Sequence, residues 1–78
     1  MNNWRETEEG LYKKFVFSDF KTAFSFMGRV AGLAEVHQHH PTWTNTYNTV
    51  EIWLISHEAG NKITDKDHQL DVAIDGLA

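Results

Sequence analysis

The positions of the histidines in this sequence indicate a site for proton transfer. His37, His39 and His40 fall within the segment VHQHHP, and His57 follows the most apolar stretch of the chain. Imidazole has an ordinary pKa near neutral pH, so that one side chain type can both accept and donate protons there. The grouping of histidines at the expected ends of chain elements therefore indicates a candidate acid–base site.

Two other interpretations stay open on the residues alone. Histidines at a helix C-terminus interact favourably with its free carbonyls and its dipole, so the cluster could be no more than a helix end. His37, His39 and His57 could also bind zinc or nickel, although no acidic residue alternates closely with them. His68 is expected to be a solvent-facing helix residue.

The histidine cluster lies between a predicted helix and a predicted strand. Asp19 has a short polar side chain that suits a helix N-cap, and we expect a helix from there to residue 35 or 36. Pro41 pushes His40 toward an extended backbone. The expected apolar face of the helix consists of Phe20, Ala23, Phe24, Met27, Val30, Ala31 and Ala34, which recur at helical spacing.

Strand composition marks three further segments, residues 11–17, 42–47 and 49–56. Residues 4–7 are short and mixed, and with a turn at 8–10 they are expected to form a hairpin with 11–17. Within 49–56, Val50, Ile52 and Leu54 alternate with Glu51, Trp53 and Ile55. A strand with apolar residues on both faces is at least partly covered on both sides. Two helices can cover one face only, so Trp53 and Ile55 favour a second subunit.

After a loop at residues 58–62, Thr64 and Asp67 have the spacing of a capping box that opens a terminal helix. The apolar stripe of that helix is Leu70, Ala73, Ile74 and Leu77. The predicted fold is α+β, with the element order β-β-α-β-β-α. A four-stranded antiparallel sheet then carries both long helices on one face.

Composition limits the other possibilities. We expect residues 1–78 to form one domain, whose core supplies no more than ~3–5 kcal/mol of net stability. Without cysteine, only tight packing, a histidine or carboxylate metal site, or oligomerisation can add to that stability.

The net charge of −4 argues against nucleic acid as a direct partner. No apolar run approaches the ~20 residues of a membrane helix, and no secretory signal is evident, so a cytoplasmic protein is expected.

The spacing of acidic, histidine and aromatic residues resembles the signature of the pterin-4a-carbinolamine dehydratases. That signature places an acidic residue four positions before His-His-Pro, then an aromatic residue, a histidine and an aspartate. Glu35, His39-His40-Pro41, Tyr47, His57 and Asp67 hold these positions here. The flanking stretches TVEIWLISHEAG and KDHQLDVAID agree as well, so the resemblance covers nearly the whole chain.

The resemblance implies an enzyme that removes water from 4a-hydroxytetrahydropterin and gives quinonoid dihydropterin, a step of tetrahydrobiopterin recycling. Members of the family need no metal and no organic cofactor. They form homodimers or homotetramers by joining sheets and packing helices. Diverged relatives act instead as dimerisation or assembly cofactors, and an intact histidine set argues against a pure scaffold here.

The resemblance also implies roles for individual residues. His39 and His57 flank the hydroxyl that leaves and serve as acid–base groups. His40 holds the substrate and shares in the proton transfer, and Pro41 fixes the backbone that presents His39 and His40.

Four further residues have implied roles around these. Ser56 and Glu58 are substrate-binding candidates through their backbone groups, because they flank the last site histidine. Asp67 orients a site histidine and Glu35 supports the His-His segment, although helix capping and plain surface charge are alternatives for these two. Gln38, where many relatives carry another polar residue, and a loop at 60–63 that is about one residue longer than usual are departures from the family pattern.

Overall fold

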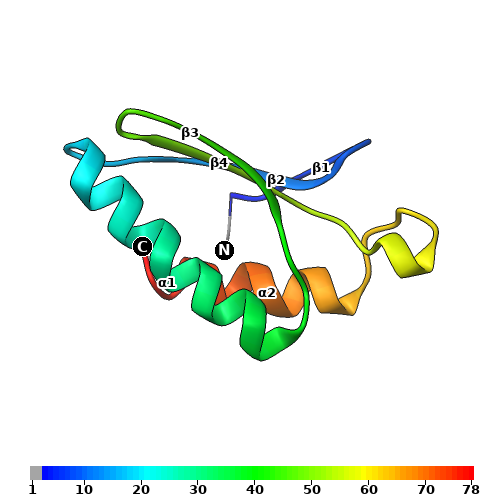
Figure 1. Ribbon diagram of the computed structural model, residues 1–78. Coiled ribbons are helices and arrows are strands. Elements are labelled where there is room, and N and C mark those ends of the chain that lie inside the picture. Colours follow the sequence, from blue (N-terminus) through cyan, green and yellow to red (C-terminus); the bar gives the residue numbers. More distant parts are fainter. Residues whose placement is uncertain (1–2) are drawn as a thin grey trace.

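A computed structural model describes residues 3–78, and its elements follow the predicted order (Figure 1). They are β1 (Arg5–Thr7), β2 (Gly10–Val16), α1 (Phe20–His37), β3 (Thr42–Thr46), β4 (Thr49–Leu54), the short 3₁₀ helix η1 (His57–Ala59) and α2 (Asp65–Asp75). The strands form one antiparallel sheet in the order β1-β2-β4-β3. Both long helices lie on the same face of it, which confirms the α+β prediction.

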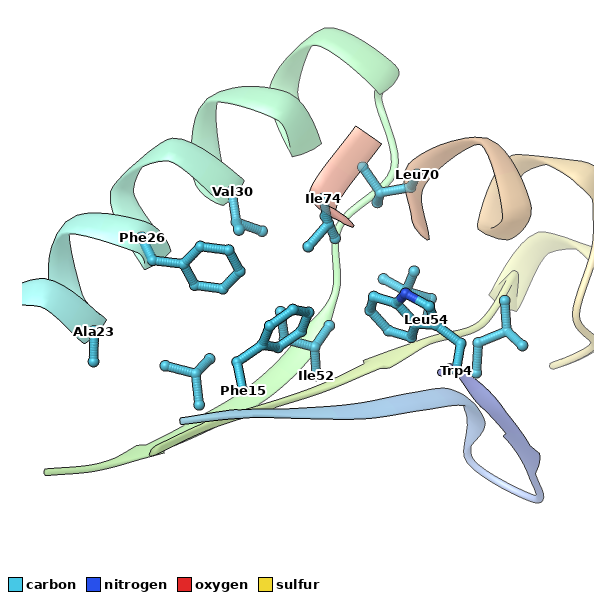
Figure 2. Packing of buried hydrophobic residues seen from close by; sticks show 11 residues of the cluster. Trp4, Phe15, Ala23, Phe26, Val30, Ile52, Leu54, Leu70 and Ile74 are labelled. Carbon is cyan, nitrogen blue, oxygen red and sulfur yellow. The ribbon is translucent and has the colours of Figure 1, made fainter. Parts of the chain in front are cut away.

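The central strand β4 fixes which residues face the helices. It pairs with β2 from Leu11↔Leu54 to Val16↔Thr49 and with β3 from Thr42↔Trp53 to Thr46↔Thr49. Because side chains alternate along a strand, one face of β4 is buried beneath the helices. Figure 2 shows Ile52 and Leu54 of this face directed toward Phe26, Val30, Leu70 and Ile74 of the two helices.

The apolar face predicted for α1 is partly wrong. The buried residues of α1 are Ala23, Phe26, Val30 and Ala34, whereas Phe20 and Phe24 are about half exposed, at 49% and 59%. Phe26 packs against Phe15 with ring centroids 4.9 Å apart. Apolar residues surround much of this helix, so periodicity allows two neighbouring stripes, and the contact with the sheet selects the one that contains Phe26.

The outer face of β4 is covered in part by the chain itself. Trp53 and Ile55 are half buried, and the ring centroid of Trp53 lies 5.2 Å from that of Tyr12 on β2. A second subunit over these residues therefore stays a prediction.

Gly10, which begins β2, must lack a side chain because a Cβ atom there would lie 2.2 Å from the carbonyl oxygen of Leu54.

The site can form where the end of α1, the segment after β4 and the start of α2 meet. The chain leaves α1, crosses to β3, and returns along β4 into η1, which leads to the start of α2. β4 ends two residues earlier than predicted, and the loop beyond it contains η1 and closes with a bridge between Ser56 and Lys62. Within residues 3–78, no helix has the length and apolar character needed to cross a membrane.

Candidate active site

A left-handed residue ends α1 just before the two adjacent histidines. α1 ends at His37, and Gln38 caps it with φ 51°, a conformation that reverses the chain direction. The backbone N–H of His39 then returns to the carbonyl of Ala34, at 3.0 Å. Beyond this turn, the side chain of His39 is buried and that of His40 is exposed.

His39 is held by the buried carboxylate of Asp67. Its Nε2 lies 2.5 Å from Oδ1 of Asp67, which is fully buried at the start of α2. The second oxygen, Oδ2, accepts hydrogen bonds from Ser56 Oγ and from the backbone N–H of Thr64, both at 2.8 Å. A carboxylate only accepts hydrogen bonds, so Nε2 of His39 donates. The lone pair of neutral His39 is therefore on Nδ1.

These contacts keep Asp67 ionised. Burial raises the pKa of Asp67, but the hydrogen bonds from His39, Thr64 and Ser56 together lower it by more, so that it lies below the ordinary value. Asp71, one turn further along α2, shows the opposite balance. Burial raises its pKa, and the hydrogen bond from His68 lowers it by less.

The two buried aspartates should therefore titrate on opposite sides of the ordinary value of ~3.9. Asp67 stabilises the fold fully above its unfolded-state pKa, and this stabilisation is lost as the pH falls through its lower folded-state pKa. The ionised form of Asp71 is unfavourable, and this cost is relieved as the pH falls through its raised pKa. Carboxyl ¹³C NMR titration measures both directly. An Asp67 that titrates above Asp71 would contradict this arrangement.

His40 and Glu35 form a second pair, at the protein surface. Nε2 of His40 lies 2.6 Å from Oε2 of Glu35, and both side chains are mostly exposed, at 61% and 73%. Exposed ion pairs contribute only ~0–1 kcal/mol, so this contact orients the ring of His40 more than it stabilises the fold. The contact with Glu35 uses Nε2 of His40 and does not involve the other ring nitrogen, Nδ1.

His57 begins η1, three positions after the last residue of β4. Its Nδ1 lies 2.7 Å from the side-chain oxygen of Asn61, and the ring is exposed. Glu58 pairs with Lys66 of α2 at 3.2 Å. A backbone hydrogen bond and the contact with Lys66 lower the pKa of Glu58.

Three histidines line one hollow. It has a volume of about 180 Å³ and is lined by Gln38, His39, His40, Ile55, His57 and Glu58. A larger hollow of about 560 Å³ shares Ile55 and His57 with it and extends over the outer face of the sheet, where it is lined by Glu8, Glu9, Thr42, Thr44, Trp53 and Asn61. The smaller hollow thus presents imidazole groups from two separate segments, and the larger one offers room beside them.

Ser56 and Pro41 lie outside the walls of both hollows. Ser56 is buried, its N–H binds the carbonyl of Lys62, and its carbonyl accepts from Ala59, Asn61 and Lys62. Its backbone groups are therefore already occupied, and its side-chain hydroxyl donates a hydrogen bond to Asp67. This geometry favours a positioning role for Ser56 over the predicted contact with substrate.

His37 and His68 also lie outside the hollows. His37 is the last residue of α1, and His68 contacts Asp71 at 3.3 Å. Among residues 3–78, no three histidine or carboxylate side chains converge closely enough to hold a metal ion. Asn61, Thr64 and Asp71 were not predicted as part of the site or its support, although the capping-box spacing did place Thr64 beside Asp67.

Comparison with known proteins identifies the family. The family model described as pterin 4 alpha carbinolamine dehydratase matches residues 1–77. The chain belongs to this family.

Similar proteins agree in sequence and in fold. Two relatives with the provisional name pterin-4-alpha-carbinolamine dehydratase come from Rhodopseudomonas palustris. The one from strain BisB18 is 48% identical over 94% of this chain and 71% of its own length, and the one from strain HaA2 is 47% identical over 96% and 75%. A crystal structure of a transcriptional coactivator/pterin dehydratase from Brucella melitensis has a TM-score of 0.91 and 35% identity, and covers 99% of this chain and 83% of that one.

Proposed function

We propose that this protein dehydrates 4a-hydroxytetrahydropterin to quinonoid dihydropterin by histidine acid–base catalysis. The observation that carries the proposal is the hollow lined by His39, His40 and His57, in which each imidazole has one ring nitrogen fixed by an oxygen partner. The family match and the size of the adjoining hollow support it. The reaction would take place in the cytoplasm, without a metal or an organic cofactor.

The chemistry needs two proton transfers around one carbon atom. The C4a–O bond breaks, and the hydroxyl leaves as water after it receives a proton. The neighbouring ring nitrogen loses its proton, and the electron pair of that N–H bond forms the C=N double bond of the product. A group that accepts and a group that donates are therefore both required, and imidazole performs either role near neutral pH.

In each imidazole, the nitrogen that is bound to an oxygen partner leaves the other nitrogen to contact the substrate. His39 and His40 engage their oxygen partners through Nε2, so Nδ1 is the atom left for substrate. His57 engages its partner through Nδ1 and leaves Nε2. We assign His39 and His57 to the proton transfers and His40 to holding the substrate. Glu58 lies at the wall of the same hollow and can accept a hydrogen bond from the pterin ring.

The direct experiment follows the dehydration itself. Freshly generated 4a-hydroxytetrahydropterin is mixed with the purified protein, and its loss is followed by absorbance in a stopped-flow instrument. We expect the rate to rise in proportion to enzyme concentration. A rate equal to that in buffer would refute the enzymatic function and favour a binding or assembly role.

We also propose that the protein forms a homodimer or a homotetramer. Phe20 and Phe24 lie on the outer side of α1, with ring centroids 5.8 Å apart, and both rings are about half exposed. Exposed, adjacent aromatic rings are typical of protein–protein contacts. Burial of one such ring against another copy would stabilise the assembly by ~1.5–3 kcal/mol.

Phe24→Lys should therefore lower the mass of the assembly. We expect sedimentation equilibrium to show an oligomer for the wild-type protein and a shift toward monomer for this variant. Ser25→Lys adds the same charge at the neighbouring exposed position of α1 and is expected to keep the wild-type mass. If both variants keep that mass, this part of α1 is not the contact surface.

A further inference from the structure

The ring of His57 is anchored by the side chain of one residue, Asn61. Oδ1 of Asn61 lies 2.7 Å from Nδ1 of His57. The loop that brings them together has two left-handed residues in sequence, Gly60 with φ 80° and Asn61 with φ 60°. Backbone hydrogen bonds from Gly60 to His57 and from Asn61 to Ser56, at 3.1 Å each, close this loop. The anchor is thus built into a defined turn.

An amide oxygen can only accept a hydrogen bond, so Nδ1 of His57 carries the hydrogen in this contact. The lone pair of the neutral ring is then on Nε2. This is the reverse of His39 and His40, which use Nε2 for their oxygen partners. Asn61 also differs from those partners in charge. Asp67 and Glu35 are carboxylates, whereas the uncharged amide of Asn61 fixes the tautomer without adding a negative charge.

We propose that Asn61 is a positioning residue that holds neutral His57 in its Nδ1–H tautomer, so that Nε2 can accept the proton from the substrate. The inference rests on the proposed function and deepens it, because it separates the proton acceptor from the other two histidines. Several charged or titratable groups lie around the same hollows, namely Glu58 on η1, Glu8 and Glu9 in the turn before β2, and His39 and His40. Among the side chains around His57, Asn61 supplies the hydrogen bond that selects the ring nitrogen.

The tautomer can be observed without any activity. Long-range ¹H–¹⁵N correlation spectra of the ¹⁵N-labelled protein, recorded where the rings are neutral, distinguish a protonated nitrogen from one with a lone pair. We expect protonated Nδ1 and unprotonated Nε2 for His57, and the opposite pattern for His39. Asn61→Gly suits the left-handed backbone and removes the side chain with its amide, so His57 should lose its preference for Nδ1–H while His39 keeps its pattern. A wild-type His57 protonated on Nε2 would overturn the inference.

Kinetics test the consequence for catalysis. Asn61→Gly should lower kcat three- to tenfold, the effect of about one neutral hydrogen bond, with little change in KM. Asn61→Asp keeps the shape but introduces a negative charge beside the exposed ring, which should move the acidic limb of the kcat–pH profile upward by about half a pH unit. An unchanged kcat in Asn61→Gly together with an unchanged profile in Asn61→Asp would overturn the positioning role.

Failure of the inference differs from failure of the proposed function. An inactive wild-type protein would refute the dehydratase proposal, and the tautomer of His57 would still decide whether Asn61 holds the ring. An active wild-type protein with His57 protonated on Nε2 would refute the role of Asn61 alone.

Discussion

Replacement of His57 by alanine should reduce kcat for the dehydration by about 10²–10⁴-fold, the usual contribution of a positioned general acid or base. The imidazole lines both hollows, and the mechanism assigns it one of the two proton transfers. The side chain is exposed, and its ring is hydrogen-bonded to Asn61. Its removal should therefore leave the fold intact, so that the loss is one of chemistry.

The matched control is His68→Ala, which removes an exposed imidazole from α2, away from the hollows. We expect it to keep kcat within about twofold of the wild-type value. Circular dichroism of both variants checks the fold, and stopped-flow turnover measures kcat. Equal activities of the two variants would show that His57 is not needed for proton transfer.

Replacement of Asp67 by alanine should destabilise the protein by about 3–5 kcal/mol, the typical cost of breaking a buried charged pair by removing one partner. Asp67 accepts hydrogen bonds from His39, Ser56 and the N–H of Thr64. The variant leaves His39 and the N–H of Thr64 without this acceptor, while Ser56 keeps its contact with Oγ1 of Thr64, and it removes one half of the capping box of α2. A domain of this size has a net stability of about the same magnitude, so much of the variant should be unfolded at 25 °C.

Asp65→Ala provides the comparison for stability, because Asp65 is an exposed carboxylate in the same first turn of α2. It should cost only ~0.3–1 kcal/mol, through the loss of a favourable interaction with the helix dipole. Urea unfolding at pH 7 gives both values. If Asp67→Ala were no more destabilising than Asp65→Ala, the buried network around His39 would not contribute to the fold.

Most of the architecture could be predicted from sequence because local signals agreed with one another. Asp19 does cap α1, and its side chain accepts a hydrogen bond from the N–H of Thr22. The alternation in β4 correctly placed Val50, Ile52 and Leu54 together on one face, which is the buried face. The spacing of Thr64 and Asp67 correctly indicated a capping box. Each of these signals depends on residues no more than five positions apart, so the chain shows them without its tertiary structure.

What sequence could not reveal depends on contacts between distant segments. Phe26 was missed because only the sheet decides which stripe of α1 is buried. The contact between His39 and Asp67 joins residues 28 positions apart, so spacing alone could not show which histidine the aspartate holds. Asn61 carries a weak signal, since asparagine tolerates left-handed backbone. That signal indicates a turn and says nothing of its bond to His57.

The central claim is that His39, His40 and His57 surround the carbon atom from which water is lost. A crystal structure of the protein with a bound, unreactive 7,8-dihydropterin tests this most directly. We predict the pterin ring in the smaller hollow, with Nε2 of His57 and Nδ1 of His39 close to the C4a–N5 edge of the ring. A pterin bound elsewhere, with this edge out of reach of all three imidazoles, would contradict the account.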